Sequence, residues 1–131
     1  MEELQSTTLY DAIGGEATVR LLVHRFYAIM DEAPEAAACR AVHPPSLVGS
    51  EAKLYDYFTG WLGGPPLYTS KHGHPMLRRR HFAARIGAEE IEGWIFCFDR
   101  ALEEAVPHPR LREIIREPIL KLAHHMHNAE S

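Results

Sequence analysis

The chain has few cysteines and no long apolar run, and both absences narrow what it can be. Its two cysteines, Cys39 and Cys97, are far apart and form no C-x-x-C pair. This excludes the usual zinc-ribbon spacing and the C-x-x-C-H signature of covalently attached haem. Both are most simply reduced thiols that act as small core residues. No stretch approaches about 18 uninterrupted apolar residues, and residues 1–15 lack the apolar core of a signal peptide. We therefore expect a cytoplasmic protein that spans no membrane.

An excess of positive charge is also missing. The chain has 14 Lys and Arg against 18 Asp and Glu, a formal net charge of −4. General binding to nucleic acid is therefore not predicted, and the short run Arg78-Arg79-Arg80 does not change this. The G-x-S-x-G, G-x-x-x-x-G-K-[ST], G-x-G-x-x-G and H-E-x-x-H motifs are absent as well, which removes several common enzyme classes.

Most of the sequence shows the periodicity that is typical of helices. The chain has 131 residues, of which 46% are hydrophobic, and we expect one domain over residues 1–131. Apolar residues recur at helical spacing in four long stretches, and no strand-like alternation is seen, so an all-α fold is predicted. The four stretches are residues 19–30, 47–61, 91–105 and 111–126.

Further predictions concern a proline in the last stretch, the short helices and the packing of the long ones. The last stripe consists of Leu111, Ile114, Ile115, Leu122 and Met126, and Pro118 predicts a kink because it removes a backbone donor. Shorter helices are predicted over residues 7–13, 36–42 and 75–82. Pairing long helices across Gly/Pro corners predicts two antiparallel pairs stacked on each other, with a crevice that suits a flat apolar molecule.

One histidine lies on the apolar side of the predicted helix 75–82. At 100° per residue, Leu77, His81 and Ala84 fall within about 60° of one another. An imidazole facing an apolar interior needs a partner there, and an iron ion held in the crevice is one candidate. Taken alone, such a histidine is more often a hydrogen-bonded core residue.

A resemblance to a known family rests on six motifs in order. They are LYDAIGG at 9–15, RFYAIMD at 25–31, RAVHPPSLVGS at 40–50, GWLGGPPLY at 60–68, GHPMLRRRH at 73–81 and GWIFCF at 93–98. Together they resemble the truncated haemoglobins of the second group over nearly the full chain. The resemblance implies a shortened globin, a two-over-two helical sandwich around non-covalent haem b, which agrees with the helical periodicity.

The resemblance also implies a role for individual residues. His81 would be the proximal iron ligand, with its second ring nitrogen bonded to a backbone carbonyl. Tyr27 and Trp94 would direct a hydroxyl and an indole N–H at the opposite, distal side of the iron. His43 would close the distal corner. The remaining predicted contacts are Ser50 and Leu54 on the distal wall, Arg80, Lys53 and Tyr68 near the haem carboxylates, and Met76, Leu77, Phe82, Ile86 and Phe98 around the proximal face and the haem edge.

Reversible binding of oxygen and other diatomic ligands at a five-coordinate iron is the function that the resemblance implies. Two donors aimed at a ligand that gains negative charge on binding predict slow oxygen release, since such hydrogen bonds contribute about 1.5–3 kcal/mol. The alternative is a haem redox enzyme that reduces peroxide or converts nitric oxide to nitrate, with a reductase as partner. A monomer or a homodimer is compatible with the sequence.

Simpler interpretations remain open at this point. Tyr27 and Trp94 are each, taken alone, more often packing residues than hydrogen-bond donors to a ligand. A third hypothesis is a non-haem metal module, because His124 and His127 share a helix face at a spacing that metal ligands use. His125, His72 and His74 would complete that hypothesis, and solvent-facing histidines are the simpler explanation.

Overall fold

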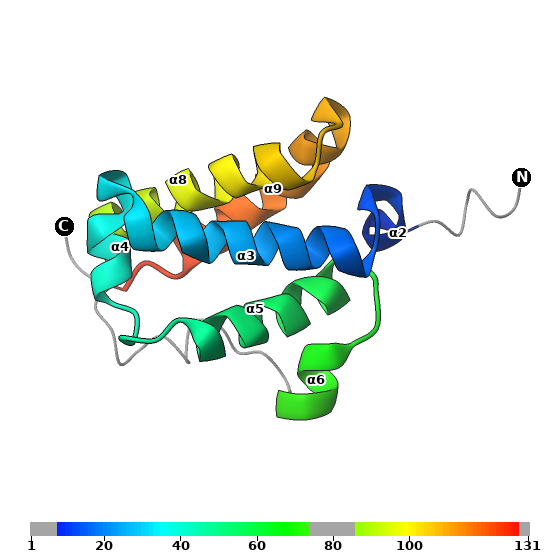
Figure 1. Ribbon diagram of the computed structural model, residues 1–131, viewed down its shortest axis with the longest axis horizontal. Helices are drawn as coiled ribbons and strands as arrows, with labels where there is room; N and C mark the ends of the chain where they lie inside the picture. Colours follow the sequence, from blue (N-terminus) through cyan, green and yellow to red (C-terminus); the bar gives the residue numbers. More distant parts are fainter. Residues whose placement is uncertain (1–7, 74–85, 129–131) are drawn as a thin grey trace, which may run out of the picture.

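The computed structural model describes residues 8–73 and 86–128 of the chain (Figure 1). All regular secondary structure within these residues is helical, which confirms the all-α prediction. None of the helices in the two described ranges has the length and apolarity that a membrane span requires.

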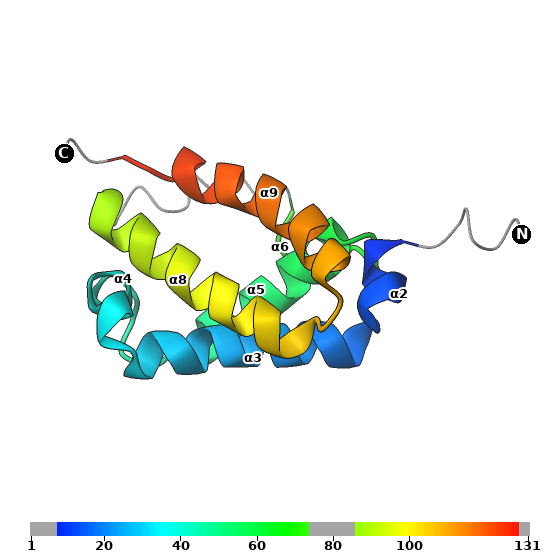
Figure 2. The same cartoon turned by 90° about the horizontal axis from the view of Figure 1, so that it is seen from above.

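Four long helices form the body of the protein, as predicted. They are α3 (Glu16–Glu32), α5 (Val48–Trp61), α8 (Ala88–Ala105) and α9 (Pro109–His125). Helix α3 packs against both α5 and α8, and α8 packs against α9. The pair α3–α5 therefore lies over the pair α8–α9, the arrangement predicted from the sequence (Figures 1 and 2).

Short helices connect these long ones. Helix α2 (Leu9–Ile13) and helix α4 (Ala37–Ala41), which follows the 3-10 turn η1 (Pro34–Ala36), occur where short helices were predicted. Helix α6 (Leu67–His72) was not predicted, because its six residues lie in a Gly/Pro-rich stretch that indicated turns. The predicted helix 75–82 lies outside the described residues.

The most completely buried part of the core lies where α3 crosses α8. The side chains of Val19, Leu22, Phe26, Phe98 and Leu102 are all almost fully buried there. Helix α8 also meets α4, at Gly93, where an added Cβ would lie 3.1 Å from Cys39 Cβ and 3.2 Å from Ala36 Cα. This glycine lets the two helices approach closely.

One prediction about α9 needs correction. Ile114 was placed in the apolar stripe but is 41% exposed, whereas Ile115 and Ile119 are buried. A stripe through 111, 115, 119 and 122 follows the helix at steps of three and four, and Ile114 lies about 100° away from Ile115 around the axis. Pro118 lies inside this continuous helix, and the kink there stays a prediction.

Candidate functional site

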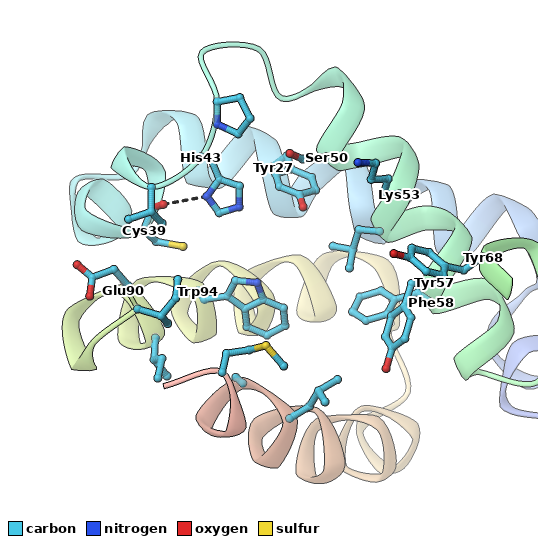
Figure 3. A pocket seen from close by; sticks show the side chains of 18 residues that line it. Tyr27, Cys39, His43, Ser50, Lys53, Tyr57, Phe58, Tyr68, Glu90 and Trp94 are labelled. Carbon is cyan, nitrogen blue, oxygen red and sulfur yellow. Dashed lines mark hydrogen bonds between the residues drawn. The ribbon is translucent and has the colours of Figure 1, made fainter. Parts of the chain in front are cut away.

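A cavity of about 650 Å³ lies between the two helix pairs (Figure 3). This volume is in the range of pockets that enclose an organic cofactor. Helices α3 and α5 and the segment after α4 form one wall, and α8 and α9 form the other. The predicted site residues that line the cavity are Tyr27, His43, Ser50, Lys53, Leu54, Tyr68, Ile86 and Trp94.

Tyr27 brings a hydroxyl group into the cavity from α3. Its side chain is only 7% exposed, and its ring meets Phe26 edge-on with 4.9 Å between the ring centroids. The hydroxyl makes no hydrogen bond to any residue in the described part of the chain. Because no fully buried polar side-chain atom there lacks a partner, this hydroxyl is exposed to the space of the cavity. Burial raises the pKa of Tyr27, so the phenol stays neutral and remains a donor.

Trp94 faces the cavity from α8 and is held by two rings. Its indole stacks on Phe98 with a centroid distance of 5.4 Å and meets Phe26 edge-on at 5.0 Å. The indole nitrogen lies on the side of the ring that faces the cavity (Figure 3). These contacts fix a second donor on the wall opposite Tyr27.

Phe98 itself is not among the residues that line the cavity, and its contact with a cofactor stays a prediction. It is fully buried between Trp94 and Phe58, whose ring centroid is 5.9 Å away. Residues 94 and 98 point in similar directions on α8, but the longer indole covers the phenyl ring. Phe98 therefore supports the cavity wall from behind.

His43 lies at the end of the cavity near α4. Its Nδ1 is 2.9 Å from the carbonyl oxygen of Cys39, and its ring is 5.9 Å from that of Tyr27, centroid to centroid. The ring therefore belongs to the same corner as the Tyr27 hydroxyl, as predicted. The arrangement brings two donors and an imidazole to one region of an otherwise mostly apolar cavity.

Helices α5 and α6 supply the rest of the predicted wall. Ser50 and Leu54 are half-buried on α5, and Lys53 lies at the exposed edge of the cavity. Tyr68 is buried on α6, which is tied to α5 by an ion pair with 3.1 Å between Lys71 Nζ and Asp56 Oδ2. This ion pair explains why the buried carboxylate of Asp56 is tolerated and why α6 lies against α5.

Comparisons with known proteins agree with this geometry. The family model described as bacterial-like globin matches residues 8–128. This chain belongs to the bacterial-like globin family. Membership implies a haem cofactor and small diatomic ligands.

Several relatives show how closely this globin resembles the group II proteins. Group 2 truncated hemoglobin YjbI of Bacillus subtilis is 35% identical over 119 residues, covering 91% of this chain and 87% of the relative. The group II 2-on-2 hemoglobin structure from Agrobacterium tumefaciens is 62% identical with a TM-score of 0.94, covering 95% of this globin and 96% of that chain. A truncated haemoglobin structure from Bacillus subtilis is 34% identical with a TM-score of 0.84, covering 93% of this globin and 100% of that chain.

Part of the predicted site lies outside the described residues. This part comprises Met76, Leu77, Arg80, His81 and Phe82. Their roles in this globin stay predictions from the family motif, above all the iron ligation by His81.

The cavity also contains residues that sequence reasoning did not assign to it. Tyr57, Phe58, Ile91, Leu122 and Met126 line it, and all five belong to the predicted helical stripes or their continuation. Their positions in the apolar stripes were the signal that would have predicted them as cavity residues. Cys39, Glu90 and Ala123 also line the cavity and lie outside the six motifs, whereas Val42 and Pro44 lie inside the motif at 40–50 but were not assigned to the site. Burial raises the pKa of the Cys39 thiol to about 12, so it stays protonated.

The hypothesis of a non-haem metal module finds no support in the described part of this globin. Within residues 8–73 and 86–128, no three His, Cys, Asp or Glu side chains come together to hold a metal ion. His124 and His125 are exposed at the end of α9, as the simpler explanation predicts. His74 lies outside the described residues.

Proposed function

We propose that this globin holds haem b non-covalently in the cavity and binds oxygen and other diatomic ligands reversibly on the side of Tyr27 and Trp94. The observation that carries the proposal is the Tyr27 hydroxyl, which faces the cavity without a hydrogen-bond partner among the described residues. A ligand in the cavity could accept a hydrogen bond from this donor, and such a bond contributes about 1.5–3 kcal/mol where the ligand carries negative charge.

The residues around the cavity fit haem. Leu54, Phe58, Ile86 and Ile91 offer apolar contacts to a flat macrocycle. Lys53, at the exposed edge, and Arg80 would pair with its carboxylates, and His81 would bind its iron. When bound, the haem would supply an iron that can take a gas molecule.

The role of the protein on the distal side is to supply hydrogen bonds. Tyr27 donates from its hydroxyl and Trp94 from its indole nitrogen. Both groups are held by ring contacts, so little reorganisation is needed when a ligand enters. The relative from Bacillus subtilis is described as an oxygen-avid haemoglobin, which supports oxygen as the ligand here.

Further predictions belong to the same proposal. The two buried free thiols, Cys39 and Cys97, are in keeping with a reducing cytoplasm. A reductase that keeps the iron ferrous, a monomeric or homodimeric state, and turnover of nitric oxide or peroxide as the alternative activity stay predictions from the sequence.

Absorption spectra of the purified protein in its ferric, deoxy-ferrous, oxygen and carbon monoxide forms test the proposal. We expect a haem b spectrum, reversible oxygenation and a five-coordinate deoxy form. The variant His81→Gly should lose haem or the spectrum of a histidine-ligated iron, and the exposed His125→Gly should behave as the wild type. A colourless protein, or an unchanged His81→Gly spectrum, would refute the proposal.

A further inference from the structure

We propose that Asn128 is a positioning residue for the bound haem, because it holds the end of α9 to Ile86 and so closes the cavity where α8 begins. Asn128 lies outside the six motifs and does not itself line the cavity. It acts through two residues that do line it, Ile86 and Met126. The inference rests on the proposed function, since it concerns how firmly the haem is held, but the contact between Asn128 and Ile86 has a test of its own.

Asn128 holds Ile86 by two hydrogen bonds, which use both polar groups of the Ile86 backbone. The N–H of Ile86 donates to Oδ1 of Asn128 at 2.7 Å. The N–H of Asn128 donates to the carbonyl oxygen of Ile86 at 2.9 Å. The two residues are 42 positions apart in the chain. Two bonds to one residue fix its direction as well as its position.

The residue after Ile86 is also held by a side chain. The N–H of Gly87 donates to Oε1 of Glu90 at 2.6 Å. Ile86 and Gly87 are both buried, and a buried backbone N–H normally needs an acceptor. At the start of a helix the helix itself does not supply one. Asn128 and Glu90 supply these acceptors, and together they fix the path of the chain into α8.

The bonds of Asn128 join the two helices that form one wall of the cavity. Ile86 leads into α8, and Asn128 follows α9. The start of α8 and the end of α9 lie at the same end of the molecule (Figures 1 and 2). The cavity is lined there by Ile86 and Ile91 from one helix and its entry, and by Ala123 and Met126 from the other. Without the bonds, the cavity can open between these two ends.

Apolar packing at this end of the cavity is limited. Ile86, Ile91 and Ala123 form a small buried cluster apart from the main core, and Met126 packs against it. Three buried side chains remove much less apolar area from water than the contact between α3 and α8 does. The hydrogen bonds of Asn128 therefore contribute a large share of what holds this end together.

Hydrogen exchange of the Ile86 amide, followed by NMR in the carbon monoxide form of the holoprotein, tests the contact. Asn128→Leu keeps the size of the side chain and removes Oδ1, whereas Asn128→Asp keeps this oxygen and removes the amide nitrogen. We expect exchange to be about two- to tenfold faster in Asn128→Leu, since one ordinary hydrogen bond is lost. Exchange in Asn128→Asp should stay near the wild-type rate. Unchanged exchange in Asn128→Leu would overturn the inference.

Transfer of haem to an excess of apomyoglobin measures how firmly the haem is held. Asn128→Leu should lose haem about two- to tenfold faster than the wild type, and Asn128→Asp should stay within about twofold of it. Arg112→Met is the matched control. It removes a bond of 2.8 Å from the Arg112 side chain to the carbonyl oxygen of Val106, at the end of α9 where no described residue lines the cavity. Its haem loss should keep the wild-type rate.

The resonance Raman band of the iron–histidine bond in the deoxy form separates positioning from general stability. His81, the predicted iron ligand, lies five residues before Ile86 in the sequence, so a displacement of Ile86 should reach this bond. We expect the band to move in Asn128→Leu and to keep its place in Asn128→Asp and Arg112→Met. An Asn128→Leu protein that unfolds more easily but keeps the band and the rate of haem loss would show a purely structural role, which would overturn the inference.

The remaining outcomes separate this inference from the proposed function. Equally fast haem loss in Asn128→Leu and Asn128→Asp would assign the effect to a group other than Oδ1, which would overturn the inference and leave the haem proposal intact. A protein that takes up no haem would overturn the proposed function and the positioning of haem together. Hydrogen exchange of Ile86 in the protein as purified would then still decide whether Asn128 holds that residue.

Discussion

The contact between α3 and α8 and the cavity walls on α5 and α9 are built from similar apolar stripes but packed differently. At the contact, Val19, Leu22 and Phe26 are at most 1% exposed. Along the cavity, Leu54 on α5 and Leu122 on α9 are only half-buried, although they too belong to apolar stripes. The same sequence pattern therefore produces a closed interface in one place and an open wall in the other.

The difference teaches where the stability of this globin comes from and where its function lies. Close-packed side chains gain dispersion contacts on all sides, whereas a cavity wall lacks them on one side. A molecule that fills the cavity supplies the missing contacts and stabilises the folded state. Leu54 and Leu122 are two stripe residues that lack such contacts on their cavity side.

The largest effect is expected where the closed interface supports the cavity wall. Phe98→Ala should lower the free energy of unfolding by about 3–5 kcal/mol, because it opens a hole behind Trp94 in a region without free space. Leu54→Ala, on the open wall, is the matched comparison and should have a clearly smaller effect in the haem-free protein. Urea denaturation of both variants measures this. Equal losses would show that the two regions are not packed differently.

A second pair of substitutions should act on the ligand and leave stability nearly unchanged. Tyr27→Phe and Trp94→Phe each remove one donor from the cavity and keep a ring in place. Given the proposed function, each should accelerate oxygen dissociation about 10- to 150-fold, which corresponds to a loss of about 1.5–3 kcal/mol. Stopped-flow kinetics measures the rates.

Tyr57→Phe is the control for this pair. Tyr57 also lines the cavity, and burial also raises its pKa, but it belongs to α5 and is not predicted to reach the ligand. Its oxygen dissociation rate should stay within about twofold of the wild type. A rate increase as large as that of Tyr27→Phe would mean that the distal donors are wrongly assigned.

The sequence allowed the long helices and much of the cavity wall to be predicted, for a physical reason. A helical stripe repeats over 14 to 18 residues in α3, α5, α8 and α9, so its direction is well determined. The family motifs then located Tyr27, His43 and Trp94, and the structure brings all three to the cavity. The role of each in ligand binding stays a prediction.

Other features depend on contacts that periodicity does not contain. Helix α6 has six residues between Pro66 and Gly73, too few for a stripe. Phe98 was predicted at the haem edge for its bulk, but bulk does not reveal that the indole of Trp94 stacks on its ring and lines the cavity. The orientation of the His43 ring depends on a hydrogen bond with the carbonyl oxygen of Cys39, four residues earlier on α4.

The smallest of the expected effects concerns the close contact between α8 and α4 at Gly93. Gly93→Ala should lower the free energy of unfolding by about 1–3 kcal/mol, because the new methyl group would lie 3.1 Å from Cys39 Cβ, 3.2 Å from Ala36 Cα and 3.3 Å from the carbonyl oxygen of Glu35. Two of these three atoms are backbone and cannot turn aside.

Gly49→Ala on α5 is the control, since nothing lies within 4 Å of the added methyl group there. It should leave the free energy of unfolding unchanged or raise it by up to about 1 kcal/mol, because alanine favours the helix. Thermal denaturation of both variants gives the comparison. Cys39 lies on α4, and Gly93 directly precedes Trp94 on α8. We therefore expect Gly93→Ala to push α4 and α8 apart and to move Trp94 at the cavity wall. The fluorescence of Trp94 should shift in Gly93→Ala and stay unchanged in Gly49→Ala. A stable Gly93→Ala protein with unchanged fluorescence would mean that α4 and α8 can separate without disturbing the cavity.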